Sequence, residues 1–193
     1  ISGIYPIEKG GRPHNLLALD EAIGLGRESG CKVHYSHATF AGQGTFDTNE
    51  DMLDTIDRAV NDGIDITFDT YSLPSGMSFI TYPMPDWYQG LSREDRKRSE
   101  NLKKLRDAFA LREEVLQYGF DIIYITNDRV PGCRGKSVAE IADMWNMDPF
   151  DAYIRLVEET DGDQRILQKT FVDDDMLRVQ MKHPRCLFMT DAW

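Results

Sequence analysis

Two segments combine an apolar run with a side chain that could bind a metal ion or transfer a proton. Residues 33–37 read VHYSH and contain two of the four histidines, and residues 186–191 read CLFMTD and end in a carboxylate. Each has the pattern of a buried β-strand with its reactive residue at the carboxyl end. In a barrel of parallel strands the active site lies at that end. The two segments therefore predict metal or acid–base chemistry at one edge of a sheet.

The two histidines of the first segment are three positions apart, so on a strand they would face opposite sides. We expect His37 to face the site because it comes later, beside Ser36 and the glycine-rich GQGT loop at residues 42–45. A histidine at a strand end can equally be a hydrogen-bonded core residue. The sequence contains no HxH and no HExxH motif, so local spacing alone completes no metal site.

Asp191 is the candidate for proton transfer. A carboxylate in this place could accept a proton from an attacking water and pass it to a leaving group, and it could also bind a metal ion. An acid after an apolar strand also commonly caps the next helix, and both interpretations stay open. Asp69 follows Phe68 in a similar place and could orient a ligand or serve a structural purpose.

Helix and strand patterns alternate over the first seventy or so residues, which favours parallel strands joined by crossover helices. Beyond them, residues 73–86 form an aromatic, proline-rich stretch that we expect to be a loop, either packed on the rim of the fold or acting as a lid. A charged helical stretch, a further strand and two helices follow, before a final strand–helix–strand. The expected helices lie at 15–30, 48–62, 92–118, 137–145 and 173–179, with a further helix that begins at Pro149, and the expected strands lie at 31–38, 64–71, 121–126, 166–172 and 186–191.

Composition excludes several classes of protein. The net charge of −11 argues against binding nucleic acid phosphates. No apolar run approaches the length needed to span a bilayer, and no secretory signal is evident. The three cysteines are widely spaced without a CxxC pair, so we expect reduced thiols in a cytoplasmic protein. Motifs for serine hydrolases, nucleotide hydrolases and dinucleotide binding are absent from the sequence.

Six segments in series resemble the D-aminoacylase (N-acyl-D-amino-acid deacylase) branch of the amidohydrolase superfamily. No single one is highly specific, but their order and spacing match across almost the whole chain. They are LDEAIGLGRESG at 19–30, VHYSH at 33–37, DITFDTY at 65–71, GKSVAEIA at 135–142, DPFDA at 148–152 and HPRCLFMTD at 183–191.

The resemblance implies an α/β fold, a metal-dependent (β/α)8 barrel of the TIM type, with zinc as the usual metal. The chain would cover roughly strands 4 or 5 to 8 of one partial barrel domain over residues 1–193, with an insertion or lid at 73–135 between strands 6 and 7. His37 matches the metal-binding histidine of the family's S-H-x-K motif, and Asp191 matches the catalytic, metal-binding aspartate of its G-S-D-G motif.

The chain also departs from the family pattern. Thr39 stands where the S-H-x-K motif has lysine, and residues 5–8 (YPIE) replace H-x-R-x-E. Tyr71 occupies the place of a metal-binding histidine that some members carry, and we retain it as a candidate substrate-binding residue. The family's HxH motif and cysteine ligand would precede Ile1, so we expect an incomplete site in a piece of a longer protein.

We therefore expect a metal-dependent hydrolase of an N-acyl amino acid or a related amide. Its partner would be a small-molecule substrate, without nucleic acid or membrane, and an oligomer is possible. Two alternatives stay open. The altered ligand positions favour a degenerate, non-catalytic binding module, and a cyclic amidase acting on a hydantoin or dihydropyrimidine ring would remain within the superfamily.

Overall fold

The computed structural model of the chain describes residues 11–38, 40–169 and 173–190. These residues form two compact units. Residues 75–169 make up the second unit, and the first unit contains the described residues on either side of it in the sequence.

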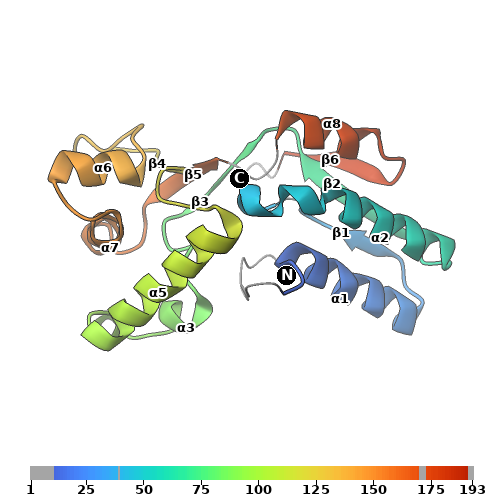
Figure 1. Ribbon diagram of the computed structural model, residues 1–193, viewed down its shortest axis with the longest axis horizontal. Helices are drawn as coiled ribbons and strands as arrows, with labels where there is room; N and C mark the ends of the chain where they lie inside the picture. Colours follow the sequence, from blue (N-terminus) through green and yellow to red (C-terminus); the bar gives the residue numbers. More distant parts are fainter. Residues whose placement is uncertain (1–10, 39, 170–172, 191–193) are drawn as a thin grey trace. The chain divides into compact units, whose positions relative to one another are not determined.

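The first unit is built on a parallel sheet of three strands. Its order is β1 (Val33–Tyr35), β2 (Ile66–Tyr71) and β6 (Cys186–Met189), with β2 in the centre. Phe68 of β2 is in register with Tyr35 on one side and Cys186 on the other. Because all three strands run in the same direction, their carboxyl ends lie at one edge of the sheet, as Figure 1 shows.

Three helices contribute to the apolar core of this unit. They are α1 (His14–Ser29), α2 (Asn49–Asn61), which follows the 3-10 helix η1 (Gln43–Thr48), and α8 (Asp174–Lys182). Each buried aliphatic or aromatic side chain stabilises such a core by about 1.5–3 kcal/mol. The helical side chains of this core include Leu16, Leu19, Ile23, Met52, Ile56, Met176 and Leu177, which cluster with Tyr35, Ile66 and Phe68 of the sheet.

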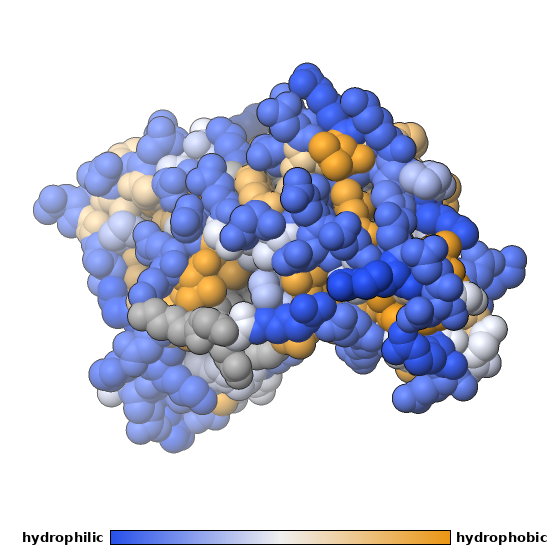
Figure 2. All heavy atoms as spheres, turned by 45° about the vertical axis from the view of Figure 1, so that its right-hand side comes forward, coloured by the Kyte–Doolittle hydropathy of each residue, from blue (hydrophilic) through white to orange (hydrophobic). Residues whose placement is uncertain are grey.

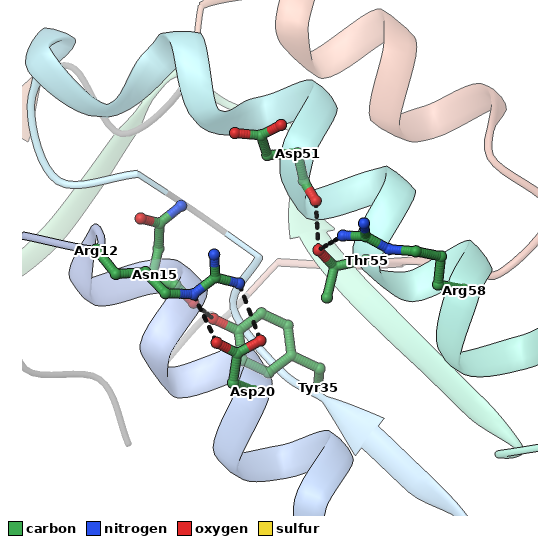
Figure 3. Close-up of polar contacts among 7 residues, drawn as sticks. All are labelled: Arg12, Asn15, Asp20, Tyr35, Asp51, Thr55 and Arg58. Atoms are coloured by element: carbon green, nitrogen blue, oxygen red, sulfur yellow. Dashed lines mark hydrogen bonds and ion pairs between the residues drawn. The ribbon is translucent and has the colours of Figure 1, made fainter. Parts of the chain in front are cut away.

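A hydrogen bond joins the start of α1 to β1. The Tyr35 hydroxyl donates to the backbone carbonyl of Asn15 over 3.1 Å, and burial raises the pKa of Tyr35 to about 12. Arg12 forms a two-pronged ion pair with Asp20, at 2.6 and 3.0 Å, in the same region (Figure 3). The hydrogen bond from Tyr35 thus holds the helix that precedes β1 against the strand, in addition to the apolar face of the helix.

A buried glutamine connects three elements of this unit. Gln180 of α8 is fully buried; its side-chain oxygen accepts from the Thr70 hydroxyl at 2.7 Å, and its amide nitrogen donates to the Asn49 side chain at 2.9 Å. Buried polar groups that lose their partners destabilise a protein more than the hydrogen bond itself contributes.

We expect Gln180→Ala to lower the free energy of unfolding by about 2–4 kcal/mol, because it leaves Thr70 and Asn49 buried without this partner. Urea denaturation followed by circular dichroism measures this effect. The matched control is Arg178→Ala on the same helix, which removes only an exposed ion pair with Asp175 and should change stability by under about 0.5 kcal/mol. Equal effects of the two substitutions would contradict this interpretation.

The second unit contains an antiparallel sheet. The order is β3 (Ser75–Phe79), β5 (Arg165–Lys169) and β4 (Ile123–Ile125), with β5 in the centre. Aromatic rings of Phe109, Phe120, Phe150 and Tyr153 pack against one another in this unit. Its helices are α3 (Asp86–Gln89), α4 (Arg93–Arg96), α5 (Ser99–Leu116), α6 (Val138–Trp145) and α7 (Pro149–Glu159).

Three helices of this unit begin at the capping residues that the sequence predicts. Ser137 and Glu140 form a complete capping box at α6, and Asp148 caps α7 immediately before Pro149. Ser92 caps the short helix α4 by accepting from the backbone of Asp95. These signals are local, so they could be read without knowing the fold.

Two expectations require correction. The stretch at 73–86 is not only a loop, because β3 lies within it and pairs with β5. The strand expected at 166–172 is observed as β5 at Arg165–Lys169, and it pairs antiparallel with β3 and β4, while β2 pairs directly with β6. The described residues therefore do not show the expected succession of parallel barrel strands. Residues 170–172 lie outside the described part of the chain.

The surface agrees with the hydrophilic composition of the chain. Figure 2 shows a face that is mostly hydrophilic, with hydrophobic residues in separate groups among the hydrophilic ones. Among the described residues, no helix is both long enough and apolar enough to cross a membrane.

Candidate active site

The candidate site begins where β1 ends. The strand stops at Tyr35, and Ser36 and His37 follow it at the carboxyl edge of the parallel sheet. His37 has a φ of 65°, in the left-handed region that histidine adopts more readily than most residues. The strand rule that would place His34 and His37 on opposite faces thus does not extend to His37, because the strand has already ended.

Asp69 of β2 organises this strand end. One carboxylate oxygen, Oδ1, accepts from the backbone N–H of His37 at 2.7 Å. The other, Oδ2, accepts from the Ser36 hydroxyl at 2.9 Å and lies 2.8 Å from His34 Nε2. Burial alone would raise the pKa of Asp69, but the hydrogen bonds from His37, His34 and Ser36 outweigh it and hold the pKa below the usual value. The carboxylate is therefore ionised at neutral pH.

His34 uses both ring nitrogens in hydrogen bonds. Nδ1 lies 2.8 Å from the Thr67 hydroxyl, and Nε2 lies 2.8 Å from Asp69. A metal ligand needs one nitrogen available to the ion, so His34 in this arrangement is a structural residue. Ser36, Asp69 and His34 do not form a hydrolytic triad either. In a triad the histidine lies between the serine and the acid, whereas here the acid lies between the other two.

The structure brings His37 and Tyr71 together. Their rings meet edge to face, with centroids 5.6 Å apart and an interplanar angle of 69°. Tyr71 is the last residue of β2, so the two side chains come from the carboxyl ends of neighbouring strands. This placement agrees with a shared site, and the metal role of His37 and the substrate role of Tyr71 stay predictions.

Asp191 lies outside the described residues, as do Thr39 and residues 5–8. Only its sequence neighbourhood can be placed. Met189, two residues earlier, closes β6 and is in register with Tyr71. The strand that precedes Asp191 thus ends at the same sheet edge as β1, the strand that precedes His37.

The metal-binding capacity of the described residues is partial. They contain no group of three or more His, Cys, Asp or Glu side chains that could hold an ion. A zinc site requires at least three protein ligands. Of the two residues that the sequence predicts as metal ligands, His37 and Asp191, only His37 lies in the described part of the chain, just after the carboxyl end of β1.

Cys186 lies beside the site but is not poised as a ligand. Burial, followed by the charge of Asp69, raises the pKa of its thiol to about 11. A metal ligand or nucleophile must be the thiolate. Sequence reasoning did not connect Cys186 with Asp69, because the connection depends on the pairing of β2 with β6.

We expect the thiols to differ in reactivity at pH 8. Cys31 is exposed and should react with a chromogenic disulfide reagent at least about 10-fold faster than Cys186, whose raised pKa lowers the thiolate fraction. Stopped-flow absorbance, with Cys31→Ser and Cys186→Ser variants to assign each phase, measures the rates. Faster modification of Cys186 than of Cys31 would contradict the burial and the charge described for this thiol.

Comparison with known proteins gives both sequence and structural relatives. N-acyl-D-glutamate deacylase of Alcaligenes xylosoxydans xylosoxydans is 27% identical over 139 residues, which are 72% of this chain and 22% of that protein. The solved N-acyl-D-glutamate deacylase of Bordetella bronchiseptica matches with a TM-score of 0.62 and 23% identity, over 91% of this chain and 29% of its own. The resemblance to the D-aminoacylases is confirmed.

A crystal structure of D-aminoacylase matches the same share of the chain, with a TM-score of 0.59 and 19% identity. These likenesses show an α/β fold of the D-aminoacylase kind. The chain spans less than a third of the length of these relatives. The Bordetella enzyme was solved with zinc and a phosphonate that mimics a tetrahedral reaction intermediate. No family model matches the chain.

Proposed function

We propose that the chain forms part of a zinc-dependent hydrolase that removes the acyl group from an N-acyl-D-amino acid. The observation that carries this proposal is the placement of His37 beside Tyr71 at the carboxyl edge of the parallel sheet. The similarity to N-acyl-D-glutamate deacylases supports the reaction class and the metal. The proposal retains a (β/α)8 barrel, with residues 73–135 as an insertion in it, and a longer natural protein.

In this proposal the chain supplies two groups to the reaction. His37 holds the metal through its imidazole, and Asp191 contributes a carboxylate that accepts a proton from the attacking water and donates it to the leaving amine. A bound zinc ion supplies Lewis acidity toward the scissile carbonyl. Tyr71 contacts the substrate next to His37. The remaining ligands come from residues outside the described part of the chain.

A degenerate binding module is the second candidate, and one observation favours it. Tyr71 stands where some members of the family that the sequence resembles carry a metal-binding histidine. Such a protein would bind an acyl amino acid without hydrolysing it. The cyclic amidase alternative differs in substrate, since it would open a ring instead of releasing an acyl group.

A substrate panel separates the three candidates. The complete protein, loaded with zinc, is assayed with N-acetyl-D-glutamate, its L enantiomer, N-acetyl-D-leucine, hydantoin and dihydrouracil, and the released products are measured by chromatography. We expect turnover of an N-acetyl-D-amino acid at least about 100-fold above that of the cyclic amides, a difference of about 2.7 kcal/mol in transition-state binding. Ring opening alone would favour the cyclic amidase, and calorimetric binding without turnover would favour the degenerate module.

A further inference from the structure

The side chain of Asp69 contacts three residues at the end of β1. Its side chain is about 10% exposed, and both carboxylate oxygens are engaged. The His37 backbone N–H, the Ser36 hydroxyl and the His34 ring reach this one carboxylate. Its oxygens are thus committed to residues of the neighbouring strand.

The backbone of Asp69 adds a further contact. Its carbonyl accepts from the Ala38 N–H at 2.8 Å. Three successive residues, Ser36, His37 and Ala38, are therefore tied to a single residue of β2. His37, the middle residue, has a left-handed backbone conformation. This conformation costs free energy for a residue other than glycine, and it persists where surrounding contacts hold it. From this backbone the His37 ring meets the ring of Tyr71.

We propose that Asp69 is a positioning residue for His37. Its carboxylate orders residues 36–38 and so aims the His37 imidazole at the carboxyl edge of the sheet, without itself binding a metal ion. The inference rests on the proposed function only where it names His37 as a zinc ligand. The ordering of the strand end is a separate claim with its own measurement.

The test compares four variants of the chain by nuclear magnetic resonance. Asp69→Ala removes every side-chain contact, and Asp69→Asn keeps the shape and one acceptor oxygen. Asp65→Asn is the matched control, because Asp65 lies just before the same strand and pairs with exposed Lys32 and with Arg185. Ile56→Val is the stability control, since it weakens the core of the first unit without touching the site.

We expect Asp69→Ala to speed hydrogen exchange of the His37 amide by at least about 10-fold and to shift the His37 imidazole resonances, which a His37→Ala spectrum assigns. For Asp69→Asn, the exchange rate and the imidazole shifts should lie between those of Asp69→Ala and of the unmodified chain. If Asp69→Ala does not fold, the Asp69→Asn measurements alone test the proposal. Neither control should move the imidazole resonances. An unchanged His37 in both Asp69 variants, or equal shifts in Ile56→Val, would overturn the proposal.

Titration with Zn²⁺ alone, followed at the same His37 resonances, links the inference to the proposed function. If the unmodified chain binds Zn²⁺, Asp69→Asn should weaken the affinity for Zn²⁺ by about 10- to 100-fold, as found for residues that orient metal ligands. Absence of zinc binding at His37 in the complete protein would count against the proposed function. The exchange and resonance measurements would still decide the role of Asp69.

Discussion

Replacing Asp191 by asparagine in the complete protein is expected to lower kcat/KM for an N-acyl-D-amino acid by about 100- to 10,000-fold. A positioned acid–base group contributes a factor of that size, and an amide cannot accept and return the proton. His37→Ala should reduce activity at least as far, through loss of a zinc ligand. Initial rates at saturating zinc, together with the zinc content of each variant, measure the two effects separately.

The two substitutions should differ in their metal content. His37→Ala is expected to lose bound zinc, whereas Asp191→Asn should retain more of it, since an asparagine oxygen remains available. Asp65→Asn is the control, because it is an exposed acid at the opposite end of β2. Activity within a factor of two of the unmodified protein in either site variant would contradict the roles that we propose for these residues.

A second large effect is expected on stability as the pH falls. His14, the first residue of α1, is partly buried, and this desolvation lowers its pKa from 6.5 to about 4. Its pKa is therefore lower in the folded state than in the unfolded state, so protons bind preferentially to the unfolded state. The stabilisation is fully present above pH 6.5 and is lost as the pH falls from 6.5 toward 4, by at most about 3 kcal/mol.

Urea denaturation at pH 7, 6, 5 and 4 measures this loss. His14→Asn removes the titrating group, so its stability should vary less with pH in that window than the stability of the unmodified chain. Acids such as Asp148 have a pKa in the folded state that lies below the unfolded value of 3.8. Their effect on the pH dependence of stability therefore falls below pH 4, outside this window. Identical pH profiles for the variant and the unmodified chain would contradict the burial of His14.

The parts of the fold that could be predicted from the sequence are those set by local signals. The helix stripe of α2 and the alternation of β2 follow from spacing alone, and Ile66 and Phe68 are indeed fully buried. The capping residues Ser137 and Asp148 also predicted the starts of α6 and α7, because a cap depends only on residues next to it in the sequence.

Other features depend on pairing between strands that are distant in the sequence, and the sequence alone could not predict them. Residues 75–79 read SGMSF beside prolines, a pattern with little strand preference, and they form β3 because β5, about 90 residues later, provides a partner. The contacts of Asp69 with residues 34–38 likewise depend on the pairing of β1 with β2. His37 was predicted as a site residue, but its left-handed backbone and its link to Asp69 required the structure.

The central claim is that His37 binds zinc at the carboxyl edge of the parallel sheet. Crystals of the complete protein grown with zinc, measured on both sides of the zinc absorption edge, test it most directly. We expect an anomalous difference peak about 2.0–2.1 Å from an imidazole nitrogen of His37, with Asp191 within reach of the same ion. A zinc peak bound elsewhere with His37 away from it, or no peak in zinc-soaked crystals of active protein, would contradict the claim.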